Sequence, residues 1–222
     1  LELIAILLGL VSAYFLFSAP GNHYRFQSEI SWLPEYTSMG LTEKLMMGVD
    51  RFNAHVNDSA NRIMLISVIM TFITTYQKPQ AWRLKPIALT ILCIFIFTGL
   101  LSQLQLAHYT GKIGFYGFIG PESWYQYDAF SSYTLTLMTY GTMACCAIYA
   151  SNNYKEVLQY LGLLTLSIGM TVALAFSPTV YASGPRILYL PDILLVIYSC
   201  LLLSKVFSEW KHTSKETISG QV

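Results

Sequence analysis

The sequence predicts an all-α fold, specifically a polytopic helical membrane protein with about six transmembrane helices and one interfacial amphipathic helix. The first observation is composition: of the 222 residues, 54% are hydrophobic and 11% are charged. A soluble domain typically has about 25% charged residues, so this chain has too few to cover a water-facing surface. The second is a mean hydropathy of +0.48. The third is a series of long apolar segments along the whole chain.

Six apolar stretches approach the roughly 20 residues that a transmembrane helix needs. They are residues 1–18, 60–77, 86–107, 131–150, 157–176 and 188–206. The second stretch is short, but its threonines can donate hydrogen bonds back to their own helix. We expect a single transmembrane domain over residues 1–222, with residues 207–222 forming a cytoplasmic tail. The first stretch has no basic region or cleavage motif before it, so we interpret the chain as part of a longer protein.

The basic residues predict which side of the membrane each connection faces. The short connection over residues 77–85 holds Lys78, Arg83 and Lys85 without an acid, and the C-terminal segment adds further lysines. Basic residues near span ends mark the cytoplasmic side. The three longer connections alternate with these segments and are expected to be extracytoplasmic; they comprise residues 19–59, 108–130 and 177–187.

An amphipathic helix is expected in the first long connection. Apolar residues recur there near the helical period, with charged and polar residues between them, over residues 41–56. Such a helix either lies in the membrane interface or packs on the rim of the bundle. Asp58 and Ser59 follow it and are expected to cap the next helix.

Composition also argues against several classes of protein. The net charge is +1 and no basic stripe is visible, so no nucleic-acid partner is expected. All four cysteines lie in apolar runs, where we expect them to behave as small buried hydrophobes. His23, His55 and His108 are scattered and no Cys/His spacing suggests a metal. No metal site and no cofactor are therefore predicted.

The first candidate binding cluster is the segment APGNHYR, which ends the first apolar stretch and contains Asn22, His23, Tyr24 and Arg25. Proline and glycine end the helix there, which leaves Arg25 at the depth of the lipid headgroups. The alternative interpretation is a plain helix stop followed by an arginine that snorkels to the interface.

The second cluster is the segment SPTVYASGPR, which contains Tyr181 and Arg186. A guanidinium donates two parallel hydrogen bonds to phosphate, so Arg25 and Arg186 together would suit a lipid phosphate or pyrophosphate. Alternatively, each arginine binds bulk lipid or a nearby carboxylate. Asp192 follows closely and has three interpretations: a functional acid at membrane depth, a favourable acid in a first helical turn, or a partner of Arg186.

The third cluster lies in the connection over residues 108–130, where glycine recurs every third residue between aromatic residues. Trp124 and Asp128 near its end would suit a sugar, because flat rings pack on sugar faces and a carboxylate accepts from sugar hydroxyls. The alternative is a belt of aromatic side chains at the membrane interface.

The two arginine motifs, in this order, resemble those of bacterial multipass membrane proteins of the GT-C-like type. The nearest group is that of Gtr-type O-antigen glucosyltransferase-like proteins and uncharacterised relatives. The resemblance implies about ten helices, a bacterial inner (plasma) membrane location, an extracytoplasmic active site and a polyprenyl-phosphate-linked sugar donor. It also implies a glycan acceptor, a catalytic acid in an upstream outer loop, and this chain as the C-terminal half. Arg25 and Arg186 would then hold the donor phosphate.

Two other functions remain open from the sequence. An envelope lipid or glycan transporter, including a flippase, would be expected to carry polar groups at mid-membrane and paired broken helices. A non-catalytic membrane subunit would use the outer connections to bind a partner.

Overall fold

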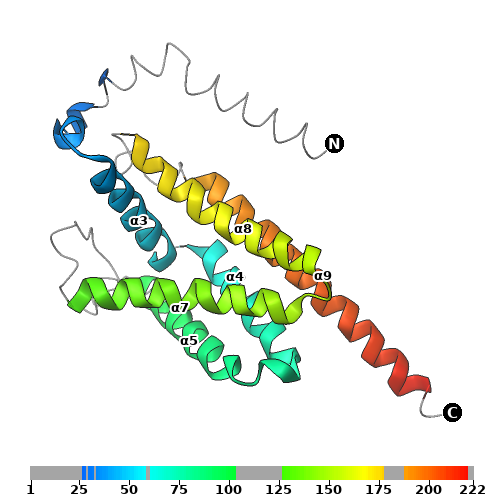
Figure 1. The fold of residues 1–222 in the computed structure, drawn as a ribbon. Helices are drawn as coiled ribbons and strands as arrows, with labels where there is room; N and C mark the ends of the chain where they lie inside the picture. Colours follow the sequence, from blue (N-terminus) through cyan, green and yellow to red (C-terminus); the bar gives the residue numbers. More distant parts are fainter. Residues whose placement is uncertain are drawn as a thin grey trace, which may run out of the picture.

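The computed structural model describes residues 27–28, 30–32, 34–58, 61–103, 127–177 and 188–219. Within these ranges the chain forms α-helices and short 3-10 turns, without any β-strand, so the all-α prediction is confirmed. The α-helices are α3 (Leu41–Asn57), α4 (Arg62–Gln77), α5 (Leu84–Gln103), α7 (Tyr127–Ala150), α8 (Tyr154–Ala173) and α9 (Tyr189–Ser219) (Figure 1).

Most predicted apolar spans coincide with helices, but their bounds shift. The stretch over residues 1–18 lies outside the described residues. Helix α7 begins at Tyr127, so Asp128 lies in its first turn and not in a loop as predicted. Helix α9 continues to Ser219, so most of the predicted tail over residues 207–222 is helical.

Two helical stretches, Tyr154–Phe176 and Tyr189–Ser208, are long and apolar enough to cross a membrane. Two further apolar helices, Arg62–Gln77 and Leu84–Leu100, are shorter. Length and composition thus weakly indicate a membrane protein.

The helices alternate in direction along the bundle (Figure 1). Helix α4 packs between α5 and α9, α8 lies along α9, and α3 packs against α7 and α8. Helices α4, α7 and α9 begin near α3, and α5 and α8 end there. We refer to this end of the bundle as the α3 end.

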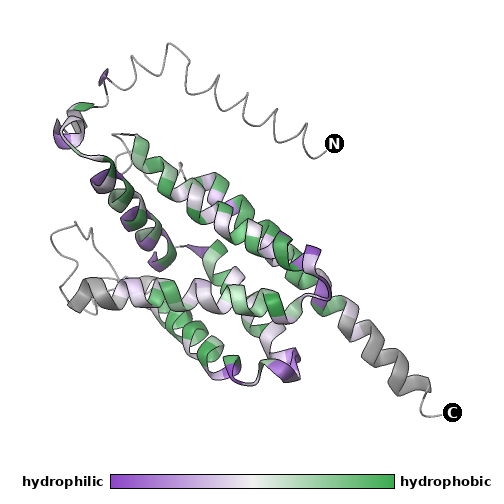
Figure 2. Cartoon of the chain, viewed as in Figure 1, coloured by the Kyte–Doolittle hydropathy of each residue, from purple (hydrophilic) through white to green (hydrophobic). Residues whose placement is uncertain are grey.

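The other end of the bundle carries most of the described basic side chains, and we refer to it as the basic end. It holds Lys78, Arg83, Lys85, Lys155 and Lys205. Lys205 pairs with Glu156 at 2.5 Å between Nζ and Oε2, which joins α9 to the start of α8. Figure 2 shows hydrophilic residues concentrated at this end and along α3, with hydrophobic residues elsewhere on the helices.

The core is apolar, and so is much of the outer surface. Buried side chains such as Phe52, Met64, Met143, Leu195 and Tyr198 form one cluster among the helices. Large apolar residues also point outward, including Phe97, which is 55% exposed, and Leu137, which is 75% exposed.

Helix α3 is held to the bundle by a close crossing over the end of α8. A methyl group on Gly48 would lie 2.4 Å from the carbonyl oxygen of Val172, so a glycine is needed at this position. Nearby, the hydroxyl of Tyr36 donates a hydrogen bond to the carbonyl of Ala175 at 2.9 Å. These contacts fix where α3 enters the bundle.

The predicted amphipathic helix is confirmed as α3, and it packs on the bundle with Phe52 and Val56 in the core. Its polar residues Asp50 and Asn53, however, are buried and do not form a solvated face. The predicted cap of the next helix is wrong: Asp58 is the C-cap of α3, and Asn61 caps α4 by accepting from the Met64 N–H at 2.9 Å.

The expectation that all the cysteines are buried is also wrong. The four thiols are free, but only Cys146 is buried, whereas Cys93 and Cys200 are exposed on the outer faces of α5 and α9. These two positions face whatever surrounds the bundle.

Candidate functional site

The C-terminal end of α3 reaches well inside the bundle. The side chain of Asn57 contacts Thr136, which lies more than two turns after the start of α7. At about 1.5 Å per residue, this contact is about 13 Å along α7 from its first residue. The break between α3 and α4 therefore lies beneath the α3 end of the bundle and not at its surface.

A seam of buried amides and hydroxyls joins α3 to α7. The side-chain amide of Asn53 donates to the Ser132 hydroxyl at 2.7 Å, and the Thr136 hydroxyl donates to the side-chain Oδ1 of Asn53 at 2.6 Å. Thr136 in turn accepts from the Asn57 amide at 2.8 Å. Buried polar groups are costly unless they are paired, so this mutual pairing stabilises the polar face of α3 inside the bundle.

Asp50 extends this seam by one turn of α3. It is 6% exposed, and the Tyr133 hydroxyl donates a hydrogen bond to its Oδ1. Burial raises the pKa of Asp50 to about 6, although the hydrogen bond from Tyr133 lowers it in part. The carboxyl group of Asp50 therefore holds its proton more tightly than an ordinary aspartate does.

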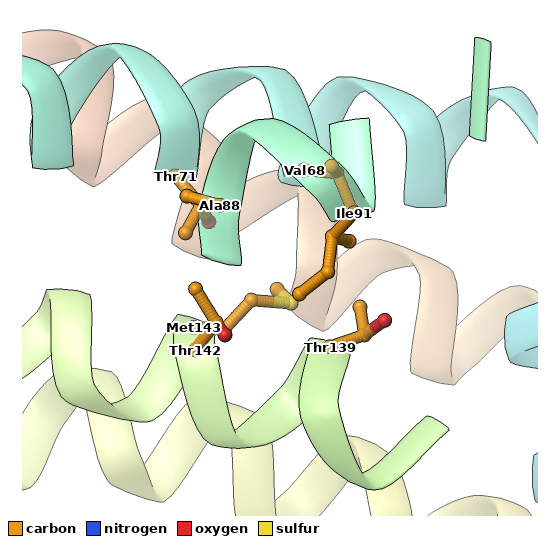
Figure 3. Close-up of a pocket in the computed structure, with 7 residues that line it drawn as sticks. All are labelled: Val68, Thr71, Ala88, Ile91, Thr139, Thr142 and Met143. Carbon is orange, nitrogen blue, oxygen red and sulfur yellow. The ribbon is translucent and has the colours of Figure 1, made fainter. Parts of the chain in front are cut away.

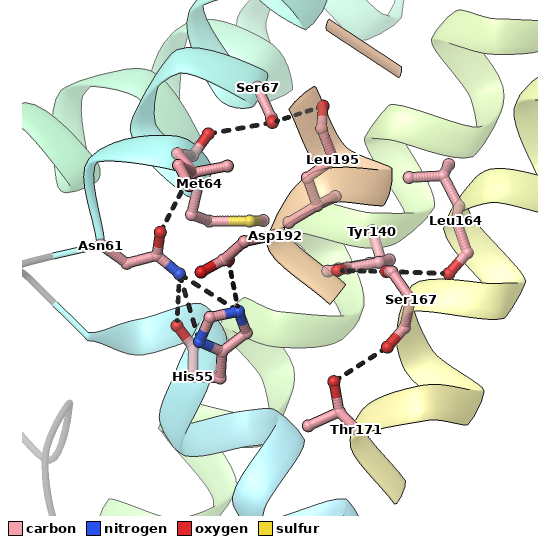
Figure 4. A network of polar contacts seen from close by, with 11 residues as sticks. His55, Asn61, Met64, Ser67, Tyr140, Leu164, Ser167, Thr171, Asp192 and Leu195 are labelled. Atoms are coloured by element: carbon pink, nitrogen blue, oxygen red, sulfur yellow. Dashed lines mark hydrogen bonds and ion pairs between the residues drawn. The ribbon is translucent and has the colours of Figure 1, made fainter. Parts of the chain in front are cut away.

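The most distinctive feature of the α3 end is a contact between His55 and Asp192. The Nε2 atom of His55 lies 3.0 Å from Oδ1 of Asp192, and the imidazole is 6% exposed. Figure 4 shows the pair between the end of α3 and the start of α9, next to Asn61. The contact thus joins two helices that are far apart in the sequence.

Asn61 defines how the imidazole is held. Its amide donates to the carbonyl of His55 at 3.0 Å and lies 3.3 Å from Nδ1 of the ring. The same amide lies 3.4 Å from Nε2. Because a carboxylate only accepts hydrogen bonds, the contact with Asp192 favours the tautomer with its proton on Nε2. The imidazole is then in close contact with Asp192, although no well-aligned hydrogen bond joins Nε2 to Oδ1.

Asp192 lies in the first turn of α9, where a carboxylate is favourable because of the helix dipole. This confirms one of the three interpretations of Asp192. Its Oδ1 is buried and has no well-aligned hydrogen bond within the described ranges, whereas the whole side chain is 20% exposed. The exposure therefore arises from side-chain atoms other than Oδ1.

A hydroxyl pair lies next to Asp192 (Figure 4). The hydroxyls of Tyr140 and Ser167 are 3.0 Å apart and join α7 to α8. Thr171 donates to the Ser167 carbonyl at 2.8 Å, one turn nearer the α3 end. The surroundings of Asp192 are thus polar as well as buried.

A separate small cavity lies deeper, between α4, α5 and α7 (Figure 3). It has a volume of about 10 Å³ and is lined by Val68, Thr71, Ala88, Ile91, Thr139, Thr142 and Met143. The Thr139 hydroxyl is buried without a hydrogen-bond partner in the described part of the chain. The space accommodates about one water molecule, which Thr139 would bind. It is too small for a substrate.

Most of the binding residues predicted from the sequence lie outside the described residues. These are Asn22, His23, Tyr24, Arg25, Trp124, Tyr181 and Arg186. Asp128 is described as part of the α7 backbone. The helix ends to which residues 104–126 and 178–187 connect are all at the α3 end.

The sequence did not predict the pair formed by His55 and Asp192, nor the hydrogen bonds of Asn61. No periodicity connects residues so far apart, and His55 lies on a helix whose polar face was expected to be solvated. A weak signal was present: Asn53 and Asn57 are one turn apart, as are Ser132 and Thr136, which indicates matching polar stripes on α3 and α7.

The fold and this cluster define an all-α helical bundle with two candidate membrane spans and a buried polar site at one end. Comparison with protein-family models, curated proteins and solved structures finds no match. The resemblance to GT-C-like proteins therefore rests on the two sequence motifs.

Proposed function

We propose that the chain is a multi-pass protein of the bacterial inner membrane, in which residues 1–18 and helices α4, α5, α7, α8 and α9 cross the bilayer. The outward-facing apolar residues support this, because a soluble protein rarely has large exposed apolar patches. The basic end carries five described basic side chains and one described acidic side chain, Glu156. This excess is typical of the cytoplasmic side, which would make the α3 end extracytoplasmic.

We further propose that the protein transfers a sugar from a polyprenyl-phosphate-linked donor to a glycan acceptor of the cell envelope. The observation that carries this proposal is the contact of the buried imidazole of His55 with Asp192, whose side chain is 20% exposed. Asp192 follows Arg186 by six residues in the chain. The connections containing Trp124, Tyr181 and Arg186 all join helix ends at the same end of the bundle. A phosphate site, a sugar site and a positioned carboxylate would thus share one face.

In this proposal Asp192 is the general base, and His55 and Asn61 position it. Oδ2 of Asp192 takes the proton from the acceptor hydroxyl as the acceptor oxygen bonds to the anomeric carbon. The bond between that carbon and the phosphate oxygen breaks at the same time, which leaves the charge on the lipid phosphate. Arg25 and Arg186 would stabilise this charge.

The proposal is tested by assaying sugar transfer in membranes that contain the full protein. Arg25→Ala and Arg186→Ala are expected to lower transfer strongly, since each removes a charge partner of the leaving group. Arg83→Ala at the basic end is the matched control and is expected to retain activity. Wild-type transfer by both Arg25→Ala and Arg186→Ala would contradict the phosphate assignment.

A second candidate, an envelope lipid transporter or flippase, is favoured by a different observation. Helices α3 and α4 are separated by a break beneath the α3 end, and polar groups of Asn57 and Asn61 lie at this break. Broken helices with polar termini are typical of transport sites. Lipid translocation in proteoliposomes without sugar transfer would favour this candidate, and transfer without translocation would exclude it.

A further inference from the structure

An apolar groove runs along the outside of the bundle between α4 and α9. It has a volume of about 190 Å³ and is lined by Ile63, Ile66, Met70, Val196, Ser199, Cys200 and Leu203. Ser199 has a polar side chain, but its hydroxyl already donates a hydrogen bond within the protein, to the Leu195 carbonyl at 2.8 Å. The groove therefore offers an apolar surface to a ligand.

A charged residue lies at the end of each wall of the groove that is nearest the α3 end of the bundle. Arg62 precedes Ile66 by one turn on α4, and Asp192 precedes Val196 by one turn on α9, so each lies on the stripe that forms its wall. Asp192 is the carboxylate that contacts His55. The groove thus leads from the apolar surface to the buried polar site.

Arg62 is in an unusual position for a cation. It occupies the first turn of α4, where the helix dipole disfavours positive charge, and no acidic residue accompanies it in that turn. The side chain is exposed and makes no hydrogen bond or ion pair with the described residues. A bound anion at the head of the groove would match this charge.

We propose that the groove binds the hydrocarbon tail of a single-chain prenyl phosphate, with Arg62 as an additional cation beside the phosphate and the reactive end beside Asp192. This inference rests on the proposed function and specifies where its donor binds. The groove suits a hydrocarbon tail because its lining is almost entirely apolar, and its volume of about 190 Å³ accommodates part of such a tail. The phosphate accounts for the exposed arginine, which a plain hydrocarbon would not.

The test is photo-cross-linking of the full chain in lipid nanodiscs with a diazirine-bearing prenyl phosphate, read by mass spectrometry of the labelled peptides. Labelling is expected on the groove faces of α4 and α9. Arg62→Gln is expected to lower it about tenfold, the cost of a lost charge-assisted hydrogen bond. Arg83→Gln, which changes an exposed arginine at the basic end, is expected to have no effect.

The two exposed cysteines provide a matched pair of groove variants. Cys200→Trp fills the groove and is expected to abolish labelling, whereas Cys93→Trp changes an exposed position on α5 and is expected to leave it intact. Unlabelled prenyl phosphate is expected to compete at least about tenfold better than the matching prenol or a diacyl phosphatidic acid.

Several results would overturn the inference. Equal competition by phosphatidic acid would assign the groove to bulk phospholipid, and equal competition by prenol would remove the role of Arg62. Labelling that appears only after residues 1–18 are deleted would show that the chain's own apolar segment covers the groove. Sugar transfer measured in the same nanodiscs separates the two proposals: transfer without groove labelling contradicts the groove alone, and groove labelling without transfer contradicts the proposed function.

Discussion

Replacement of Gly48 by alanine tests how α3 is held against α8. The added methyl group would lie 2.4 Å from the Val172 carbonyl oxygen, 2.9 Å from the Val172 Cα and 3.0 Å from the Ala175 Cβ. Two of these contacts are with backbone atoms, so no side-chain rotation relieves them. Since favourable carbon contacts begin near about 3.5 Å, α3 would have to move outward by about 1 Å.

The expected free-energy change follows from two opposing effects. Overpacking of a tight site typically costs about 1–3 kcal/mol, whereas alanine gains about 0.5–1 kcal/mol over glycine inside a helix. We therefore expect Gly48→Ala to destabilise the protein by about 1–2 kcal/mol. For a chain of this size, this corresponds to a fall in Tm of about 2–8 °C.

The assay is thermal unfolding of the purified protein in detergent, with Gly169→Ala in α8 as the matched control. No atom lies within 4 Å of a methyl group placed on Gly169, so that variant is expected to be as stable as the wild type or slightly more stable. Equal Tm values for Gly48→Ala and Gly169→Ala would refute the close crossing. The same variant is expected to lower sugar transfer, because a shift of α3 moves His55 away from Asp192.

Three further variants test the α3 end. Asn53→Leu removes hydrogen-bond partners from Ser132 and Thr136 and leaves both hydroxyls buried. Unfolding in detergent is expected to show that the free energy of unfolding falls by about 1–3 kcal/mol. An unchanged free energy of unfolding would contradict the seam. Asn61→Ala removes the cap of α4 and is expected to cost about 1 kcal/mol by the same assay; a stability equal to that of the wild type would contradict this capping role. Burial raises the pKa of Asp50 from 3.8 to about 6, so the folded protein binds this proton more tightly than the unfolded chain does. The contribution of Asp50 to stability is therefore expected to increase as the pH falls from about 7 towards 4. Asp50→Asn should remove that component from a pH series of Tm values, and an unchanged series would contradict it.

The sequence predicted the helices well because their signal is local. The apolar runs and the period of residues 41–56 depend on neighbouring residues, and five of the described helices match predicted spans while α3 matches the amphipathic segment. Helix ends were less accurate: α4 is capped by Asn61 and not by Asp58 or Ser59. The side chains of all three residues are of a type that caps helices, so the sequence offers equivalent candidates. Only the packing of α3 decides among them.

The candidate site could not be predicted in the same way. A polar helix face normally indicates contact with water, yet Asp50 and Asn53 face α7, which carries the matching hydroxyls. The pairing of His55 with Asp192 depends on how deeply α3 enters the bundle, and that depth is set by the close approach at Gly48. Such tertiary contacts are not visible from composition or periodicity.

The most direct test of the proposed function is the sugar-transfer rate of Asp192→Asn, compared with Asp58→Asn, which changes an exposed carboxylate at the end of α3. Loss of a general base typically lowers a rate by about 10²–10⁴-fold, and we expect a loss of this size for Asp192→Asn. Its Tm is expected to fall only slightly, because a favourable charge at the start of α9 is lost. Asp58→Asn is expected to transfer sugar at the wild-type rate. Wild-type transfer by Asp192→Asn would contradict the role of the pair formed by His55 and Asp192.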